Sequence, residues 1–218
     1  MTTTPITITP AITANQVRAW SMFAASRGQR YARCRFSNWQ ADLYSKQFVA
    51  AQTVERYVAE WRDTVADGRG LILIGPCGTG KDHLLAAASY ELIRLGGLGE
   101  FGRIAWTSGA NLFSKAKPTA EQMKLFKTAT VLAVSDPCES GHSLTKSQTD
   151  LLQSIIDARY SAARATWITT NADSREHLDG MIGPAMVDRL IDGATIIATD
   201  WPSFRKPAAT TGAATDAS

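Results

Sequence analysis

Residues 71–84 read LILIGPCGTGKDHL, a short apolar run followed by a glycine-rich turn and a lysine. The apolar run predicts a strand over 71–75 that is buried on both faces, and the residues after it predict a helix over 81–95. The glycines permit the backbone turns that point successive N–H groups at phosphate oxygens. Lys81 and the start of the helix add positive charge at the same place. The stretch therefore predicts a phosphate-binding loop, and its flanking strand and helix argue against a turn without a ligand.

Two positions depart from the usual pattern of such a loop. G-x-x-x-x-G-K normally continues with Ser or Thr, whose hydroxyl holds the Mg²⁺ of a nucleotide, but this chain has Asp82. A nucleotide site also needs a carboxylate at the end of another strand. The apolar run 131–134 is the candidate, and such strands usually end in two acids, one for the metal and one for the attacking water. Here the first of the two is Ser135 and the second is Asp136.

The two departures have one joint interpretation, because both positions lie around the same metal in this kind of site. We hypothesise that the ligands have exchanged places: Asp82 binds Mg²⁺ directly, and Ser135 bonds to a metal-bound water. Oxygen ligands suit Mg²⁺ in either arrangement. Without the metal, Asp82 would repel a phosphate by about 4 kcal/mol at ~4 Å and an effective dielectric near 20. The alternative is decay to a pseudo-ATPase that binds nucleotide poorly. The candidate metal residues are Asp82, Ser135 and Asp136.

The rest of the chain predicts the fold class. Short apolar runs alternate with segments of helical period, and this alternation is typical of a parallel sheet with helices on both faces. We expect an α/β fold with a five-stranded parallel sheet. The further strands are predicted at 103–108, 130–136, 165–171 and 194–200. The further helices are predicted at 13–28, 42–66, 146–162, 174–179 and 183–191, with short helices within 110–127. Val49 and Tyr160 are expected on the apolar stripes of their helices.

Composition narrows the class of protein. The chain has 218 residues with a formal net charge of +3, which permits a nucleic-acid partner without arguing for one. Its three cysteines include no C-x-x-C pair, so a structural zinc site is not expected. No apolar run reaches the roughly 20 residues of a membrane span, and residues 1–12 do not resemble a signal peptide. We expect a cytoplasmic protein without a membrane partner. Residues 206–218 are predicted to be a disordered tail.

Four stretches, in order, resemble one family of AAA+ ATPases, the DnaC-type helicase loaders and the related IstB-type transposition ATPases. The resemblance runs from about residue 30 to 205 and is carried by ARCRFSNW, GRGLILIGPCGTGKDHL, SQTDLLQSIIDARYSAARATWITTN and AMVDRLIDGATIIATDWPSFR. It implies an AAA+ core over 31–205, preceded at 1–30 by a short N-terminal helical extension that would dock on a partner. The chain departs from the family at Asp82 and Ser135, and its N-terminal part lacks zinc-ligand spacing, unlike loaders that carry a zinc-binding domain for helicase contact.

The resemblance also implies roles for single residues. Asp136 would be the catalytic carboxylate and Asn171 the sensor of the γ-phosphate, although Asn also favours capping the next helix. Arg189 would reach the nucleotide of a neighbouring subunit, which requires self-association; the alternative is a surface arginine. The expected ligands are ATP and Mg²⁺. The residues expected to line the ATP site are Gly75, Pro76, Cys77, Gly78, Thr79, Gly80, Lys81, Asp82 and His83.

The implied function is that of a helicase loader in DNA replication. Such a protein binds ATP, hydrolyses it weakly, and couples its nucleotide state to the delivery of a ring-shaped replicative helicase onto single-stranded DNA. The two substitutions at the metal positions leave hydrolysis open. The alternatives are a transposition helper ATPase of the IstB type and a non-hydrolysing adaptor that uses the fold only as a binding surface.

Overall fold

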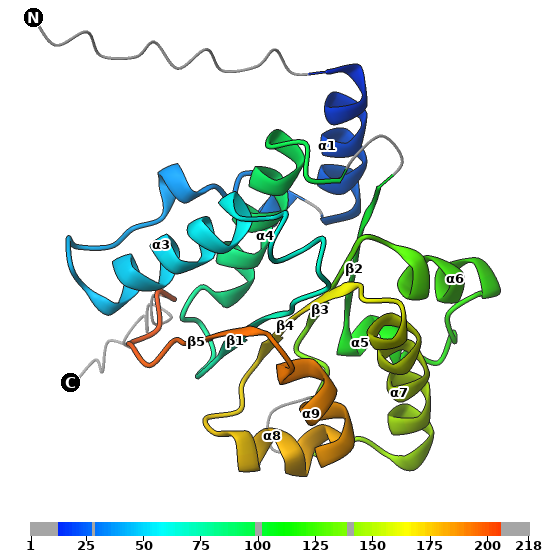
Figure 1. Cartoon of the computed structure of the whole chain (residues 1–218). Coiled ribbons are helices and arrows are strands. Elements are labelled where there is room, and N and C mark those ends of the chain that lie inside the picture. Colours follow the sequence, from blue (N-terminus) through cyan, green and yellow to red (C-terminus); the bar gives the residue numbers. More distant parts are fainter. Residues whose placement is uncertain (1–12, 28, 99–101, 139–141, 206–218) are drawn as a thin grey trace, which may run out of the picture.

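The structure is a computed structural model, and it describes residues 13–27, 29–98, 102–138 and 142–205. Within them, five strands form one parallel sheet in the order β2-β3-β4-β1-β5 (Figure 1). The strands are β1 (Leu71–Ile74), β2 (Ile104–Ser108), β3 (Val131–Ser135), β4 (Ala165–Thr170) and β5 (Thr195–Ala198). The predicted five-stranded parallel sheet is confirmed. Its order places the carboxyl ends of β3, β4 and β1 side by side at the centre.

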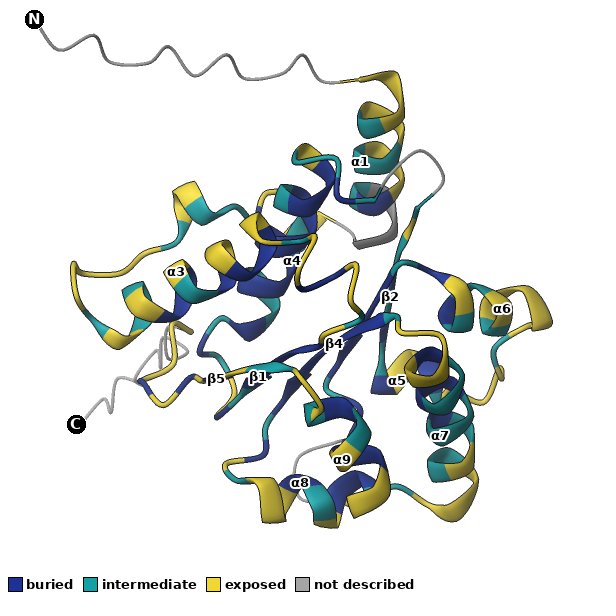
Figure 2. Ribbon diagram, in the orientation of Figure 1, coloured by how far each residue is buried: buried dark blue, intermediate teal, exposed yellow. Residues whose placement is uncertain are grey.

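Helices cover both faces of the sheet, as expected from strands that are apolar throughout. Leu71 and Leu73 of β1 pack with α3 and α4 on one face, and Ile72 packs with the helices on the other. Figure 2 shows buried residues concentrated along the sheet between these two layers. The first layer contains α3 (Lys46–Ala59) and α4 (Lys81–Arg94), and the second α5 (Gly109–Leu112), α6 (Ala120–Thr128), α7 (Lys146–Ser161), α8 (Arg175–Ile182) and α9 (Pro184–Ile191).

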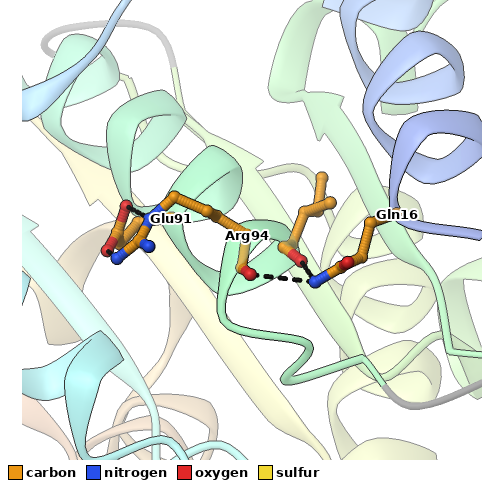
Figure 3. A network of polar contacts seen from close by, with 4 residues as sticks. Gln16, Glu91 and Arg94 are labelled. Atoms are coloured by element: carbon orange, nitrogen blue, oxygen red, sulfur yellow. Dashed lines mark hydrogen bonds and ion pairs between the residues drawn. The ribbon is translucent and has the colours of Figure 1, made fainter. Parts of the chain in front are cut away.

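The segment that precedes α3 is helical and packs beside α4. It consists of α1 (Ala14–Arg27), α2 (Gln29–Ala32) and the short 3₁₀ helix η1 (Phe36–Asn38). Gln16 of α1 donates from Nε2 to the carbonyls of Ile93 and Arg94 at 3.2 and 2.9 Å, near the C-terminal end of α4 (Figure 3). The carbonyls in the last turn of a helix lack the usual partner four residues on, and Ile93 accepts the N–H of Gly96 at 3.1 Å in addition to Gln16. The predicted N-terminal helix is therefore present and fixed to the core.

Three details of the predicted helices are wrong. The helix predicted over 42–66 is shorter: α3 begins after Ser45, whose hydroxyl accepts the N–H of Phe48, and it ends before a series of turns. Val49 is 53% exposed, so it lies off the buried stripe of α3. Tyr160 of α7 is 49% exposed, and its hydroxyl donates to Asp192 at 2.8 Å. Periodicity predicted the helices but not these polar contacts at their edges.

In the part of the chain that the structure describes, no helix is both long enough and apolar enough to cross a bilayer. The predicted tail at 206–218 and the first 12 residues of the N-terminal extension lie outside the described residues.

Candidate nucleotide-binding site

The loop between β1 and α4 has the backbone that a phosphate site requires. Gly75, Gly78 and Gly80 have φ angles of 139°, 84° and 88°, in the region that favours glycine. A Cβ at Gly80 would lie 2.6 Å from the ring of Trp39, so the ring's close approach also demands glycine there. Gly80 precedes the first residue of α4, and the free N–H groups of the helix face the loop.

Lys81 is the first residue of α4, and its side chain reaches back to the loop. Its side chain is 6% exposed, and its Nζ donates to the carbonyls of Gly75 and Pro76 at 2.6 and 2.8 Å and to Asn171 Oδ1 at 2.9 Å. Burial lowers the pKa of Lys81, while the negative charge of Asp136 opposes that shift. The ammonium is therefore desolvated and aimed into the loop, as a phosphate-binding lysine needs to be.

The carboxylate of Asp82 is held by three hydroxyl groups. Ser135 Oγ lies 2.8 Å from each of its two oxygens. Thr169 Oγ1 donates to Oδ1 at 2.8 Å. The Tyr31 hydroxyl donates to Oδ2 at 3.3 Å. The two positions that depart from the usual pattern thus meet directly. Sequence reasoning missed Thr169 and Tyr31, which are 87 and 51 residues away from Asp82 along the chain.

Asp136 lies at the end of β3 in a left-handed backbone conformation, with φ of 43°. Asp tolerates this region better than most residues. Its N–H donates to the carbonyl of Thr169 at 2.9 Å. Burial raises the pKa of the Asp136 carboxyl, the negative charge of Asp82 raises it further, and Lys81 lowers it. Among the described residues, its buried Oδ1 has no hydrogen-bond partner.

These residues fit a Mg²⁺-nucleotide. The like charges of the Asp82 and Asp136 carboxylates repel each other, and the buried Oδ1 of Asp136 has no hydrogen-bond partner among the described residues. A divalent cation or its bound water would satisfy both groups. Within the described ranges, no three His, Cys, Asp or Glu side chains gather into a metal cluster. Mg²⁺ needs none, since proteins usually hold it by one or two carboxylates together with phosphates and waters. Asp82, Ser135 and Asp136 are the residues that would hold it.

A cavity of about 370 Å³ opens over the loop. Its rim is aromatic: the Trp39 ring lies 5.4 Å from the rings of His83 and Phe204. Phe204 is fixed there because its N–H donates to the carbonyl of Gly78 at 2.9 Å. The size and the mixture of aromatic and polar walls suit a small ligand. Of the residues expected to line an ATP site, those at the wall are Cys77, Gly78, Gly80, Lys81, Asp82 and His83.

The other expected residues of the ATP site divide into two groups. Gly75 and Pro76 form the base of the loop through their carbonyls, which Lys81 contacts. Thr79 is fully buried, and its hydroxyl bonds to the Pro76 carbonyl at 3.0 Å and to Thr199 at 2.9 Å. The side chain of Thr79 therefore supports the loop from behind.

Asn171 and Arg189 have different surroundings. Asn171 lines the cavity and contacts Lys81. It does not cap the following helix, since Ser174 caps α8. Arg189 borders a separate hollow of about 440 Å³ near the amino ends of β1, β4 and β5. There its Nε lies 3.3 Å from Asp157 Oδ1. The structure brings Asn171 to the loop and leaves Arg189 away from it, so action across a subunit boundary stays a prediction.

The family model described as IstB-like ATP binding protein matches residues 23–211. The chain belongs to this family. An insertion sequence ATP-binding protein of Sinorhizobium fredii is 32% identical over 153 residues, which cover 66% of this IstB-like chain and 49% of that protein. The replicative helicase loader DnaC of Escherichia coli K12 is 28% identical over 181 residues, which cover 79% of this chain and 69% of that protein.

The fold of this IstB-like chain also agrees with a solved structure. The crystal structure of the DnaC helicase loader superposes with a TM-score of 0.66 at 22% identity, covering 78% of this chain and 99% of that one. The predicted resemblance to DnaC- and IstB-type AAA+ proteins is confirmed, and so is the predicted α/β nucleotide-binding fold.

Proposed function

We propose that the protein is a helicase-loader-type ATPase that binds Mg²⁺-ATP over the loop at 75–82. The observation that carries this proposal is convergence: Lys81, Asn171 and Asp136 come from three different elements and meet at one cavity. The similarity to DnaC, named as a replicative helicase loader, supports the choice of partner. In this proposal, nucleotide state controls the hold on a ring-shaped replicative helicase that is delivered to single-stranded DNA in the cytoplasm.

Each part of the site has a separate task in this proposal. The loop N–H groups and the start of α4 bind the phosphates, and Lys81 exchanges its carbonyl partners for phosphate oxygens. Asp82 and Ser135 would hold the Mg²⁺, which would supply positive charge against the negative charge of the phosphates. Asp136 orients the attacking water, and Asn171 contacts the γ-phosphate. Hydrolysis is weak because it also needs a cation supplied by a neighbour.

That cation is Arg189 of a second copy of the chain. In this proposal Arg189 leaves Asp157, which lies 3.3 Å away, and reaches the nucleotide of the adjacent subunit. A residue that acts in trans makes self-association a condition of turnover. The N-terminal extension at 1–30, with α1 fixed on α4, is the segment proposed to dock on the helicase. Tyr31, directly after it, bonds to Asp82.

A second candidate function is that of a transposition helper on duplex DNA. It is favoured by the family model over residues 23–211 and by the name of the Sinorhizobium relative, an insertion sequence ATP-binding protein. The site would work in the same way, and only the partner and the form of DNA would differ.

One set of binding measurements separates these proposals. ATP binding and turnover are measured with and without Mg²⁺, first alone and then with single-stranded or duplex DNA. A loader binds a replicative helicase in an ATP-dependent way and prefers single strands. A transposition helper binds a transposase and prefers duplex. Absence of ATP binding in the folded protein would contradict both and leave a non-hydrolysing adaptor.

A further inference from the structure

Thr169 contacts both acidic residues of the candidate metal site. It lies on β4, between β1 and β3, and its side chain is fully buried. Its hydroxyl donates to Asp82 Oδ1 at 2.8 Å. The same oxygen lies 3.3 Å from the backbone nitrogen of Asp136, whose N–H it accepts, and the Thr169 carbonyl accepts that N–H at 2.9 Å. Nothing in the loop pattern or in the strand pattern assigns a role to this residue.

We propose that Thr169 is a positioning residue that sets the orientation of the Asp82 carboxylate relative to Asp136 and so determines metal affinity. The proposal rests on the proposed function, because it concerns the Mg²⁺ that accompanies ATP. Asp82 lies in the first turn of α4 and Asp136 directly follows β3, so no short covalent connection fixes the distance between their carboxylates. A buried hydroxyl that bonds to both provides the connection.

Thr169 can set the orientation, whereas Ser135 alone cannot. Ser135 Oγ is 2.8 Å from both oxygens of Asp82, and its single proton serves only one of them at a time. Thr169 Oγ1 accepts the Asp136 N–H, and its own proton goes to Asp82 Oδ1 at 2.8 Å because the other acceptor, Ser135 Oγ, is 3.4 Å away. With Oδ1 bonded to Thr169, the Ser135 proton goes to Oδ2 at 2.8 Å, and Tyr31 at the cavity wall donates to Oδ2 at 3.3 Å.

The test compares Thr169→Val with Thr169→Ser. Valine has the same branched shape and suits a strand, but it neither donates nor accepts a hydrogen bond. Serine keeps the hydroxyl. The control is Thr107→Val, since Thr107 is also buried in a strand while its hydroxyl lies 3.4 Å from the Ser108 carbonyl. Thr169→Ala removes the same hydroxyl and replaces the valine variant if that one does not fold.

The measurement is Mn²⁺ binding, followed by the EPR signal of the free ion with a non-hydrolysable ATP analogue present. Loss of an outer partner of a metal ligand typically weakens binding by roughly 10- to 100-fold. We expect Thr169→Val to raise the half-saturating Mn²⁺ concentration by that factor. Thr169→Ser and Thr107→Val should both stay within about threefold of the parent. Affinity for the analogue in EDTA should change little, because among the described residues the Thr169 hydroxyl bonds to Asp82, Ser135 and the Asp136 N–H, and not to Lys81.

Each outcome decides the proposal. Parent-like Mn²⁺ affinity in a folded Thr169→Val variant would overturn it. An equal loss of affinity for the ATP analogue with and without metal would also overturn it, because such a loss would reflect a changed structure of the site and not weaker metal binding. In an Asp82→Asn background, Thr169→Val should have no further effect on Mn²⁺, and an additive loss would contradict action through Asp82. If the parent protein itself shows no metal-dependent binding, the proposed function fails first, and this inference fails with it.

Discussion

Ser135 Oγ on β3 lies 2.8 Å from both carboxylate oxygens of Asp82 at the start of α4. The usual pattern has a hydroxyl on the loop and a carboxylate on the strand, and here the two groups have exchanged positions and still meet. The exchange hypothesis requires these two side chains to lie close together even without a metal, and they are in direct contact. Binding of Mg²⁺ by this pair remains a prediction, and decay of the site remains its alternative.

Lys81→Ala should abolish ATP binding. The ammonium is buried in the loop, and charge-assisted hydrogen bonds are each worth about 1.5–3 kcal/mol, so its removal should weaken ATP affinity by at least about tenfold. Equilibrium titration with a fluorescent ATP analogue measures the effect. Lys124→Ala on α6 is the matched control, since Lys124 is exposed and outside the cavity. Unchanged affinity in Lys81→Ala would mean that the loop is not the phosphate site.

Arg189→Ala should leave ATP affinity near that of the parent and lower turnover by at least about tenfold, because a trans-acting arginine stabilises the transition state and not the bound nucleotide. Mixing this variant with Asp136→Asn should recover part of the activity, since some interfaces then pair an intact Asp136 with an intact Arg189. Arg62→Ala, at an exposed turn, is the control. No recovery at any ratio, with both variants folded and assembling together, would rule out action across subunits.

Arg159→Met should destabilise the protein strongly. Arg159 is fully buried, and burial lowers its pKa to about 9. Its guanidinium donates to the carbonyls of Phe126 and Ala129 at the end of α6, at 2.8 and 2.9 Å. It also donates to the Ala165 carbonyl at 2.6 Å. Leaving these acceptors unpaired should cost at least about 3 kcal/mol.

For a chain of this length, a loss of that size corresponds to a fall in Tm of roughly 6–12 °C, measured by thermal unfolding. Arg164→Met is the control, because Arg164 is only half-buried and donates to one carbonyl, that of Lys127. Equal stability of Arg159→Met and the parent would show that these bonds contribute nothing net.

Asp136→Asn should stabilise the protein without nucleotide or metal. The pKa of Asp136 is raised by burial first and by Asp82 second, so the folded state holds the proton more tightly than the unfolded state. Its contribution to the free energy of unfolding is fully present below the ordinary Asp pKa and is lost as pH rises through the raised value. The variant should therefore gain about 0.5–2 kcal/mol at neutral pH.

The gain from Asp136→Asn should shrink as pH falls toward about 4, where the parent carboxyl is protonated too. Asn tolerates the left-handed backbone of this position, so strain does not obscure the comparison. Thermal unfolding in EDTA across this pH range measures the gain, with the exposed Asp63→Asn as the control. A loss of stability at neutral pH, or a gain that does not depend on pH, would contradict the account.

The sequence predicts those parts of the fold that depend on local pattern. The apolar runs predict all five strands of the sheet to within about two residues at either end, because a strand buried on both faces has no polar side. The loop and its lysine follow from spacing alone. The sequence pattern does not predict the left-handed backbone of Asp136, the burial of the Arg159 charge or the exposure of Val49. Each of these depends on neighbours that packing brings close.

The candidate site likewise contains residues that a sequence motif predicts and residues that only packing brings together. Asp82 and Ser135 were expected together because both positions have known places around the metal in this kind of site. Thr169 and Tyr31, which complete the hydroxyl contacts of Asp82, come from distant parts of the chain and carry no motif. Trp39 and Phe204 meet over the loop across 165 residues of chain, and a single sequence shows no sign of that contact.

The central claim is that the metal ligands have exchanged places, and a double-mutant cycle tests it most directly. ATP affinity is measured with and without Mg²⁺ for the parent, Asp82→Thr, Ser135→Asp and the double variant. The exchange predicts that Asp82→Thr weakens Mg²⁺-dependent binding and that the double variant restores it, with a coupling of roughly 0.5–3 kcal/mol. Additive effects, or an Asp82→Thr protein that binds Mg²⁺-ATP more tightly than the parent, would contradict it and favour a decayed site.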